Sequence, residues 1–160
     1  MGNKPVYICA GETDPMNSPN ANTYPESPRV GAGAIVIHEG RILLVKRGVE
    51  PGRGLWAIPG GTLQLGETLR ECAAREVLEE TGVTIAVGEC VYVFDLIERD
   101  ESGEIKFHFV VADFAALYVS GEPKGADDAE AAGWFSPLDL PDLPVSQNTI
   151  KALHSLGFLN

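Results

Sequence analysis

The sequence predicts an α+β fold in which a mixed β-sheet is sandwiched between helices. Its 160 residues suit one compact domain. Strand patterns flank a single strong helix pattern near the middle, at residues 69–81. A long strand pattern, residues 105–119, is apolar on both faces, which is typical of a central strand that is covered on both sides.

The remaining elements follow from local patterns. Residues 30–37 and 42–46 flank a short turn and predict a β-hairpin. A segment dense in glycine and proline, residues 48–61, leads to the central helix, which Gly82 ends. Beyond the helix we expect strands at residues 83–97 and 134–135, an acidic loop at 121–133 and a last helix at 149–156.

The domain is predicted to begin near residue 29. Residues 1–28 are rich in Asn, Pro, Ser and Thr and are expected to form an N-terminal extension with one short strand at residues 6–9. The start of the chain lacks the basic and apolar regions of a secretion signal. We therefore expect one domain over residues 29–160.

Composition limits the partners and the compartment. The formal net charge is −11, which repels phosphate backbones and anionic lipid, so binding to bulk nucleic acid or to a membrane surface is not expected. The 44% of hydrophobic residues can build a core. Cys9, Cys72 and Cys90 form no CxxC pair, which fits a reducing cytoplasm and excludes a structural zinc site made of thiolates.

The central helix breaks two rules of helix chemistry. Thr68 and Glu71 predict a capping box at its start, and Leu69, Cys72 and Ala73 form a face that should pack inward. Continued toward the C-terminus, this face carries three carboxylates: Glu76, Glu79 and Glu80. Like charges at these spacings cost ~0.2–0.5 kcal/mol per pair. The dipole at the helix C-terminus disfavours anions as well.

A bound divalent cation resolves this conflict, because hard Mg²⁺ or Mn²⁺ prefers carboxylate oxygens. The alternative is a solvated acidic helix. That alternative must explain why the acids occupy the packing face while Ala74 and Leu78 point the other way.

The spacing of the surrounding residues is more specific. Gly61, Glu67 and residues 75–83 match the complete Nudix box, GX5EX7REUXEEXGU, at every specified position. Residues 29–158 resemble a Nudix hydrolase throughout. The resemblance implies an α/β/α sandwich with a mixed sheet and a loop–helix–loop metal site. It also implies hydrolysis of a nucleoside diphosphate linked to another group.

The resemblance assigns roles to residues of the loop and helix. The implied ligands of Mg²⁺ or Mn²⁺ are the Gly60 carbonyl, Glu76, Glu79 and Glu80. Glu67 would steady the loop, and Arg75 would orient the glutamates by ion pairing. A carboxylate must also act as general base. Glu76 is one candidate, and Asp128, with Asp127 and Glu130 near it in the acidic loop, is another.

Segments outside the box resemble the compact ADP-ribose pyrophosphatase branch, so ADP-ribose is the leading expected substrate. Candidate substrate contacts are Arg47 and Arg53 for phosphate, and Trp56 and Phe94 for the base. Solvated arginines and plain core aromatics are the alternatives. Alternative functions are a pyrophosphatase of nucleoside triphosphates or NADH, and a nucleotide-sugar sensor without catalysis. Homodimers are common in this branch, and the N-terminal extension is a candidate for the contact.

Overall fold

The computed structural model describes residues 22–160, so the expected strand at residues 6–9 and most of the extension lie outside the described residues. Four strands precede the first helix, and three more strands separate it from the helices at the C-terminal end. The elements are β1 (Arg29–His38), β2 (Arg41–Arg47), β3 (Trp56–Ala57), β4 (Gly60–Thr62), α1 (Leu69–Thr81), β5 (Thr84–Arg99), β6 (Ile105–Ser120), β7 (Ala129–Phe135), the short 3-10 helix η2 (Leu140–Asp142) and α2 (Gln147–Ser155).

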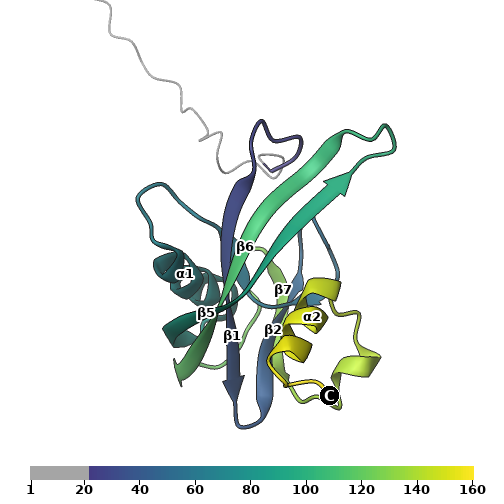
Figure 1. Ribbon diagram of the computed structural model, residues 1–160. Coiled ribbons are helices and arrows are strands. Elements are labelled where there is room, and N and C mark those ends of the chain that lie inside the picture. The colour runs from purple at the N-terminus through teal and green to yellow at the C-terminus, as the bar shows by residue number, and fades with distance from the viewer. Residues whose placement is uncertain (1–21) are drawn as a thin grey trace, which may run out of the picture.

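β1 is the strand around which the sheet is organised. It pairs in parallel with β6 and antiparallel with β2 and β4. The main path of the seven-stranded sheet runs β3-β2-β1-β6-β5, with β4 beside β1 and β7 beside β2. Figure 1 shows β5 and β6 as a long twisted ribbon that rises past the rest of the sheet. The predicted mixed sheet is confirmed.

The helices cover different parts of the sheet. Ala32 and Ala34 of β1 pack with Cys72 and Val77 of α1 in one apolar cluster. Ile35 of β1 points into a second cluster that α2 closes with its buried alanine and leucine residues. In Figure 1, α1 and α2 accordingly lie on opposite sides of the strands. The predicted sandwich is therefore present, with β1 contributing to both layers.

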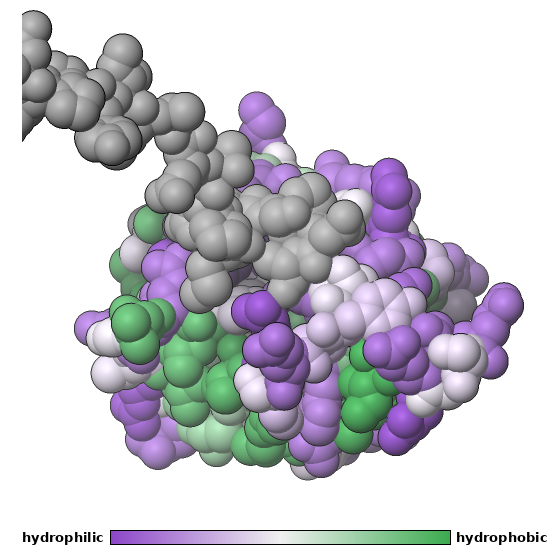
Figure 2. Space-filling view, turned by 90° about the horizontal axis from the view of Figure 1, so that it is seen from above, coloured by the Kyte–Doolittle hydropathy of each residue, from purple (hydrophilic) through white to green (hydrophobic). Residues whose placement is uncertain are grey.

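β6 occupies the central position predicted for it, between β1 and β5. Its cover is less complete than its apolar sequence suggests, because Leu117 and Val119 near its end are 72% and 57% exposed. Seen from above, Figure 2 shows hydrophobic side chains between the hydrophilic ones that cover much of that face. No helix within residues 22–160 has the length and hydropathy that crossing a membrane requires.

The acidic loop is shorter than expected. Residues 129–133 belong to β7, which pairs with β2 over the whole range from Arg47 to Ile42. The sequence AEAAG has little intrinsic preference for strands, so the pairing with β2 decides its conformation. In the same way, two pieces of the segment dense in glycine and proline form the short strands β3 and β4, because β3 pairs with β2 and β4 pairs with β1. The last helix starts two residues early because Ser146 caps it.

α1 forms over the predicted residues. Thr68 accepts a hydrogen bond from the backbone N–H of Glu71, whose carboxylate accepts in turn from the N–H of Thr68. Gly82 ends the helix in the left-handed conformation, with φ 73°. Cys72, Ala73 and Val77 anchor one face of α1 to the sheet. This anchoring fixes the direction of the acidic residues in its last turns.

We expect Thr68→Ala to lower the free energy of unfolding by about 1 kcal/mol, because it removes the side chain that caps α1. Denaturant unfolding measures the change. Thr68→Ser is the matched control, since serine keeps the hydroxyl acceptor. Equal stabilities for the two variants would show that the capping box contributes nothing.

Candidate active site

Glu80 joins α1 to the strand that precedes it in the sequence. Its side chain is buried, with 5% of the residue exposed, although glutamate is rarely buried unless it is paired. The backbone N–H of Gly60 donates a hydrogen bond of 3.1 Å to its Oε2. The carboxylate therefore holds α1 to Gly60 of β4.

Glu76 lies one helical turn earlier, against the next glycine. Its side chain is 12% exposed. A Cβ atom at Gly61 would overlap the Glu76 carboxylate, so only glycine at position 61 leaves room for it. Position 60 requires glycine for a different reason, because a Cβ there would lie 2.6 Å from the backbone of β1. The two glycines allow α1, β4 and β1 to approach one another.

Arg75 holds the acidic residues in place. Its guanidinium donates two hydrogen bonds to Glu67, of 2.7 and 3.0 Å, and one of 3.2 Å to the Thr62 carbonyl. It also contacts Glu76 Oε1 at 2.6 Å and Glu79 Oε2 at 3.2 Å. Glu67 in turn accepts from the N–H of Gln64, so the ion pair closes the loop before α1. Arg75 therefore joins the loop before α1 to the acidic residues of the helix, and the positioning roles expected of Glu67 and Arg75 stay a prediction.

The buried carboxylates perturb one another. Burial and, to a smaller extent, the charge of Glu76 raise the pKa of Glu80 to about 8. The Gly60 N–H and the Arg47 guanidinium oppose this rise in the Glu80 pKa. Burial also raises the pKa of Glu76, against the effect of Arg75. Hydrogen bonding to Arg75 instead lowers the pKa of Glu67.

The loop between β6 and β7 docks on the C-terminal end of α1. The N–H groups of Lys124 and Ala126 donate to the carbonyls of Thr81 and Glu80, each at 3.0 Å. Such carbonyls lack partners within a helix, so the loop satisfies them. This docking brings Asp127 close enough to raise the pKa of Glu76, and Asp128 close enough to raise that of Glu80.

The candidate bases differ in their surroundings. Asp128 is exposed as a residue, but partial desolvation of its carboxyl group and the charge of Asp127 raise its pKa. Its carbonyl accepts from the N–H of Gly48 at 2.8 Å, which fixes its backbone. Glu130 lies on β7 and forms an ion pair of 3.6 Å with Lys46. Asp127 and Asp128 are thus the loop acids whose charges act on Glu76 and Glu80.

The donor set fits a hard divalent cation. Bound positive charge offsets the repulsion between carboxylates that raise one another's pKa. Carboxylate oxygens are also the atoms that Mg²⁺ and Mn²⁺ prefer. Within residues 22–160, no three His, Cys, Asp or Glu side chains form a ready-made coordination shell. The half-exposed Glu79 forms an ion pair with Arg75, and this orientation is one reason why no such shell is preformed.

The predicted substrate contacts are only partly gathered at the site. Arg47 lies close enough to lower the pKa values of Glu80 and Asp128, and its Nε donates to the Pro51 carbonyl at 2.7 Å. Arg53 lines a separate cavity of about 350 Å³ with Lys106 and Phe107.

The two aromatic candidates lie apart from the glutamates. Trp56 packs edge-on against Phe135, 4.7 Å between ring centroids, in the cluster beneath α2. Phe94 lies on β5, with its ring 5.7 Å from that of Tyr92.

Sequence reasoning passed over Asp113. This residue of β6 is 4% exposed, and burial raises its pKa to about 7. A signal was available, because one acid interrupts a strand that is otherwise almost entirely apolar.

We expect the metal-free protein to become less stable as pH rises from about 4.5 to 8. The pKa of Glu80 is about 8 in the folded protein against an ordinary 4.5, so the folded state binds more protons in this window. Glu80→Gln should reduce the slope of unfolding free energy against pH, measured in chelator. Glu98→Gln, at an exposed position, is the control. A slope unchanged by Glu80→Gln would contradict the buried carboxylate.

Comparisons with known proteins agree with this geometry. The NUDIX domain model matches residues 27–156. An ADP-ribose pyrophosphatase of Methanocaldococcus jannaschii is 35% identical over 77% of this chain and 70% of its own length. An oxidized purine nucleoside triphosphate hydrolase of Danio rerio is 36% identical over 71% of this chain and 67% of its own.

A solved structure shares the fold. A MutT NUDIX hydrolase from Burkholderia pseudomallei superposes with a TM-score of 0.71 and 38% identity, covering 82% of this chain and 99% of the other. The residues that the NUDIX domain model matches include β4, α1 and the loop between β6 and β7. The chain therefore belongs to the Nudix family of hydrolases.

Proposed function

We propose that this Nudix hydrolase cleaves ADP-ribose to AMP and ribose 5-phosphate and requires Mg²⁺ or Mn²⁺. The observation that carries the proposal is the burial of Glu76 and Glu80 against the glycines of β4, at a site that repulsion between like charges destabilises. The 35% identity to an ADP-ribose pyrophosphatase favours this substrate among the nucleotides of the family.

The proposed metal ligands are the Gly60 carbonyl, Glu76, Glu79 and Glu80. A bound divalent cation supplies positive charge that offsets the charge of the pyrophosphate and assists ionisation of water. Arg75 positions Glu76 and Glu79 through its 2.6 and 3.2 Å contacts, and Glu67 holds Arg75 from the other side. Arg47 is proposed to contact a phosphate oxygen, since its charge already acts on the site.

We propose Asp128 as the general base, with Glu76 as the alternative. Water attacks phosphorus, its proton passes to the carboxylate, and the bond to the bridging oxygen breaks as the second phosphate leaves. A base is most effective when its pKa approaches the working pH, and burial raises the pKa of Asp128 in that direction. Asp128 is exposed to incoming water, whereas Glu76 accepts a hydrogen bond from Arg75.

Arg53 is proposed to contact the group beyond the second phosphate, because it lines the 350 Å³ cavity with Lys106. Trp56 and Phe94 remain candidates for binding the base. The contacts of Trp56 with Phe135 favour a packing role for it.

A nucleoside triphosphate pyrophosphatase is the second candidate function. It is favoured by the 36% identity to the oxidized purine nucleoside triphosphate hydrolase. Both activities use the same carboxylates and differ in the group that leaves. We also propose a cytoplasmic location, which suits a nucleotide substrate and the free thiols of Cys72 and Cys90. A homodimer is proposed as the assembly.

The test is a substrate panel with Mg²⁺: ADP-ribose, NADH, dGTP and an oxidised dGTP. We expect AMP from ADP-ribose at the highest kcat/KM. Preference for a triphosphate would support the second candidate. Metal-dependent nucleotide binding without turnover would identify a sensor.

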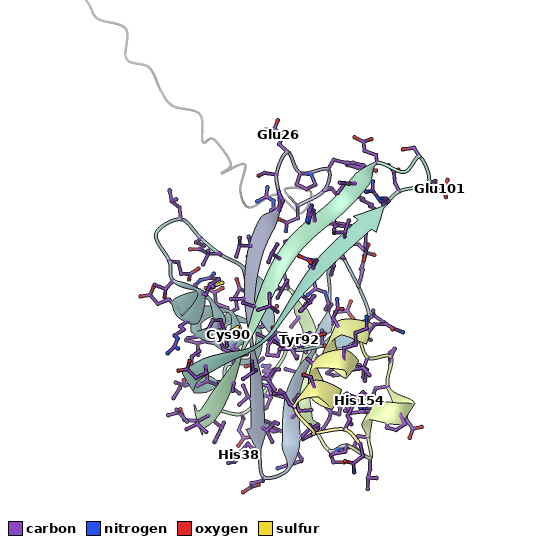
Figure 3. The ribbon with its side chains drawn as sticks, in the orientation of Figure 1. Glu26, His38, Cys90, Tyr92, Glu101 and His154 are labelled. Carbon is purple, nitrogen blue, oxygen red and sulfur yellow. The ribbon has the colours of Figure 1, made fainter. Side chains whose placement is uncertain are left out.

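We expect Glu80→Gln to lower kcat by ~10²–10⁴-fold, the range for loss of a preorganised electrostatic contact. Product formation at saturating substrate and metal measures it. Glu101→Gln is the matched control, because Glu101 lies in the exposed β5–β6 turn, which Figure 3 shows far from α1. Full activity in Glu80→Gln would refute its role at the metal.

A further inference from the structure

Asp113 is the buried acid that the proposed reaction does not use. It lies on β6, which is an interior strand, and pairs with Gly33 of β1 on one side and Tyr92 of β5 on the other. Only 4% of the residue is exposed. Side chains of a strand alternate between faces, and its neighbours Ala112 and Phe114 belong to the cluster under α1. Asp113 therefore points to the opposite face of the sheet.

That opposite face is mainly apolar around Asp113. Tyr92 and Ile58 pack there into the cluster that α2 closes. Figure 3 shows Tyr92 near the centre of the molecule, beside α2. The carboxyl group lies over Gly33, because a Cβ at Gly33 would be only 2.5 Å from Asp113 Oδ1. A glycine at this position of β1 therefore makes the space that the carboxyl group occupies.

Within the described residues 22–160, the carboxyl group of Asp113 has no protein partner. Among residues 22–160, no N–H or O–H group donates to it and no cation pairs with it, and burial is the one cause of its raised pKa. Buried polar groups are normally hydrogen-bonded, and an unpaired acid in apolar surroundings lowers stability. An acid retained under these conditions is a candidate for contact with a ligand.

Asp113 lies in the same row of paired backbone residues as Gly60, although its side chain is on the face of the sheet that α1 does not cover. Gly33, beside Asp113, pairs on its other side with Gly60, whose N–H holds Glu80. Adjacent strands are separated by about 4.8 Å, so Asp113 lies about 10 Å across the sheet from Gly60. A nucleotide spans a comparable distance between its phosphates and the far part of its sugar or base.

We propose that Asp113 binds the nucleoside portion of the substrate, its carboxyl oxygens accepting hydrogen bonds from a pair of adjacent donors. The inference rests on the proposed nucleotide substrate. Such donor pairs occur in the 2′- and 3′-hydroxyls of a ribose and in the N1–H and N2–H groups of guanine. A carboxylate can accept from both members of the pair.

The test is equilibrium binding of AMP, 2′-deoxy-AMP and GMP by calorimetry, with metal chelated so that no turnover occurs. Asp113→Asn keeps the size of the side chain and should weaken AMP binding about 10- to 100-fold, the loss expected for hydrogen bonds to a charged group. Asp95→Asn, an exposed acid on β5, is the matched control and should bind like the unmodified protein. Asp113→Ser is a second variant if the first is poorly folded.

The ligands separate the two sources of donors. If the ribose supplies them, 2′-deoxy-AMP binds the unmodified protein about as weakly as AMP binds Asp113→Asn. If the base supplies them, the preference between AMP and GMP disappears in that variant. In turnover assays the variant should raise KM and leave kcat nearly unchanged, which a purely structural acid would not do.

Equal affinity of Asp113→Asn and the unmodified protein for both AMP and GMP would overturn the inference, and so would failure of the unmodified protein to bind any of the three nucleotides. Binding that depends on Asp113, without hydrolysis on the substrate panel, would contradict the proposed function alone. Hydrolysis with unchanged affinity and KM in the variant would contradict the role of Asp113 alone.

Discussion

The burial of two like-charged carboxylates in the last turns of one helix is the constraint on which the structure of the site depends. Glu80 and Glu76 lose hydration, repel one another and lie at the negative end of the α1 dipole. The fold accepts this because the first turns of α1 are capped and packed on the sheet. Packing of the apolar half of α1 thus keeps the acidic half in a position that is electrostatically unfavourable.

The surrounding protein compensates only part of that cost. Arg75 neutralises charge on the Glu67 and Glu79 side, and backbone N–H groups of the docking loop satisfy the final carbonyls of α1. Glu80 accepts a hydrogen bond from Gly60, yet its pKa remains raised to about 8. The incomplete compensation leaves a place for a divalent cation, and it separates this arrangement from a solvated acidic helix, whose carboxylates would point to water.

The sequence predicts the parts whose signal is local and fails where distant pairing decides. α1 and its caps follow from Thr68, Glu71 and Gly82, and the inward stripe correctly places Glu76 and Glu80 in contact with the sheet. The sequence predicts a loop over most of β7, because AEAAG carries no strand signal of its own. Its pairing with β2 makes it a strand. Spacing also could not show that Trp56 would pack on Phe135, or that Gly33 would make room for Asp113.

Binding of Mn²⁺ to the chelator-treated protein, followed by the loss of the free-ion electron paramagnetic resonance signal, tests the central claim most directly. The buried carboxylates predict saturable binding that the double variant Glu76→Gln, Glu80→Gln abolishes. The same variant should be more stable than the unmodified protein without metal, because it removes the repulsion. Equal Mn²⁺ binding in both proteins would contradict the claim that these two glutamates form the metal site.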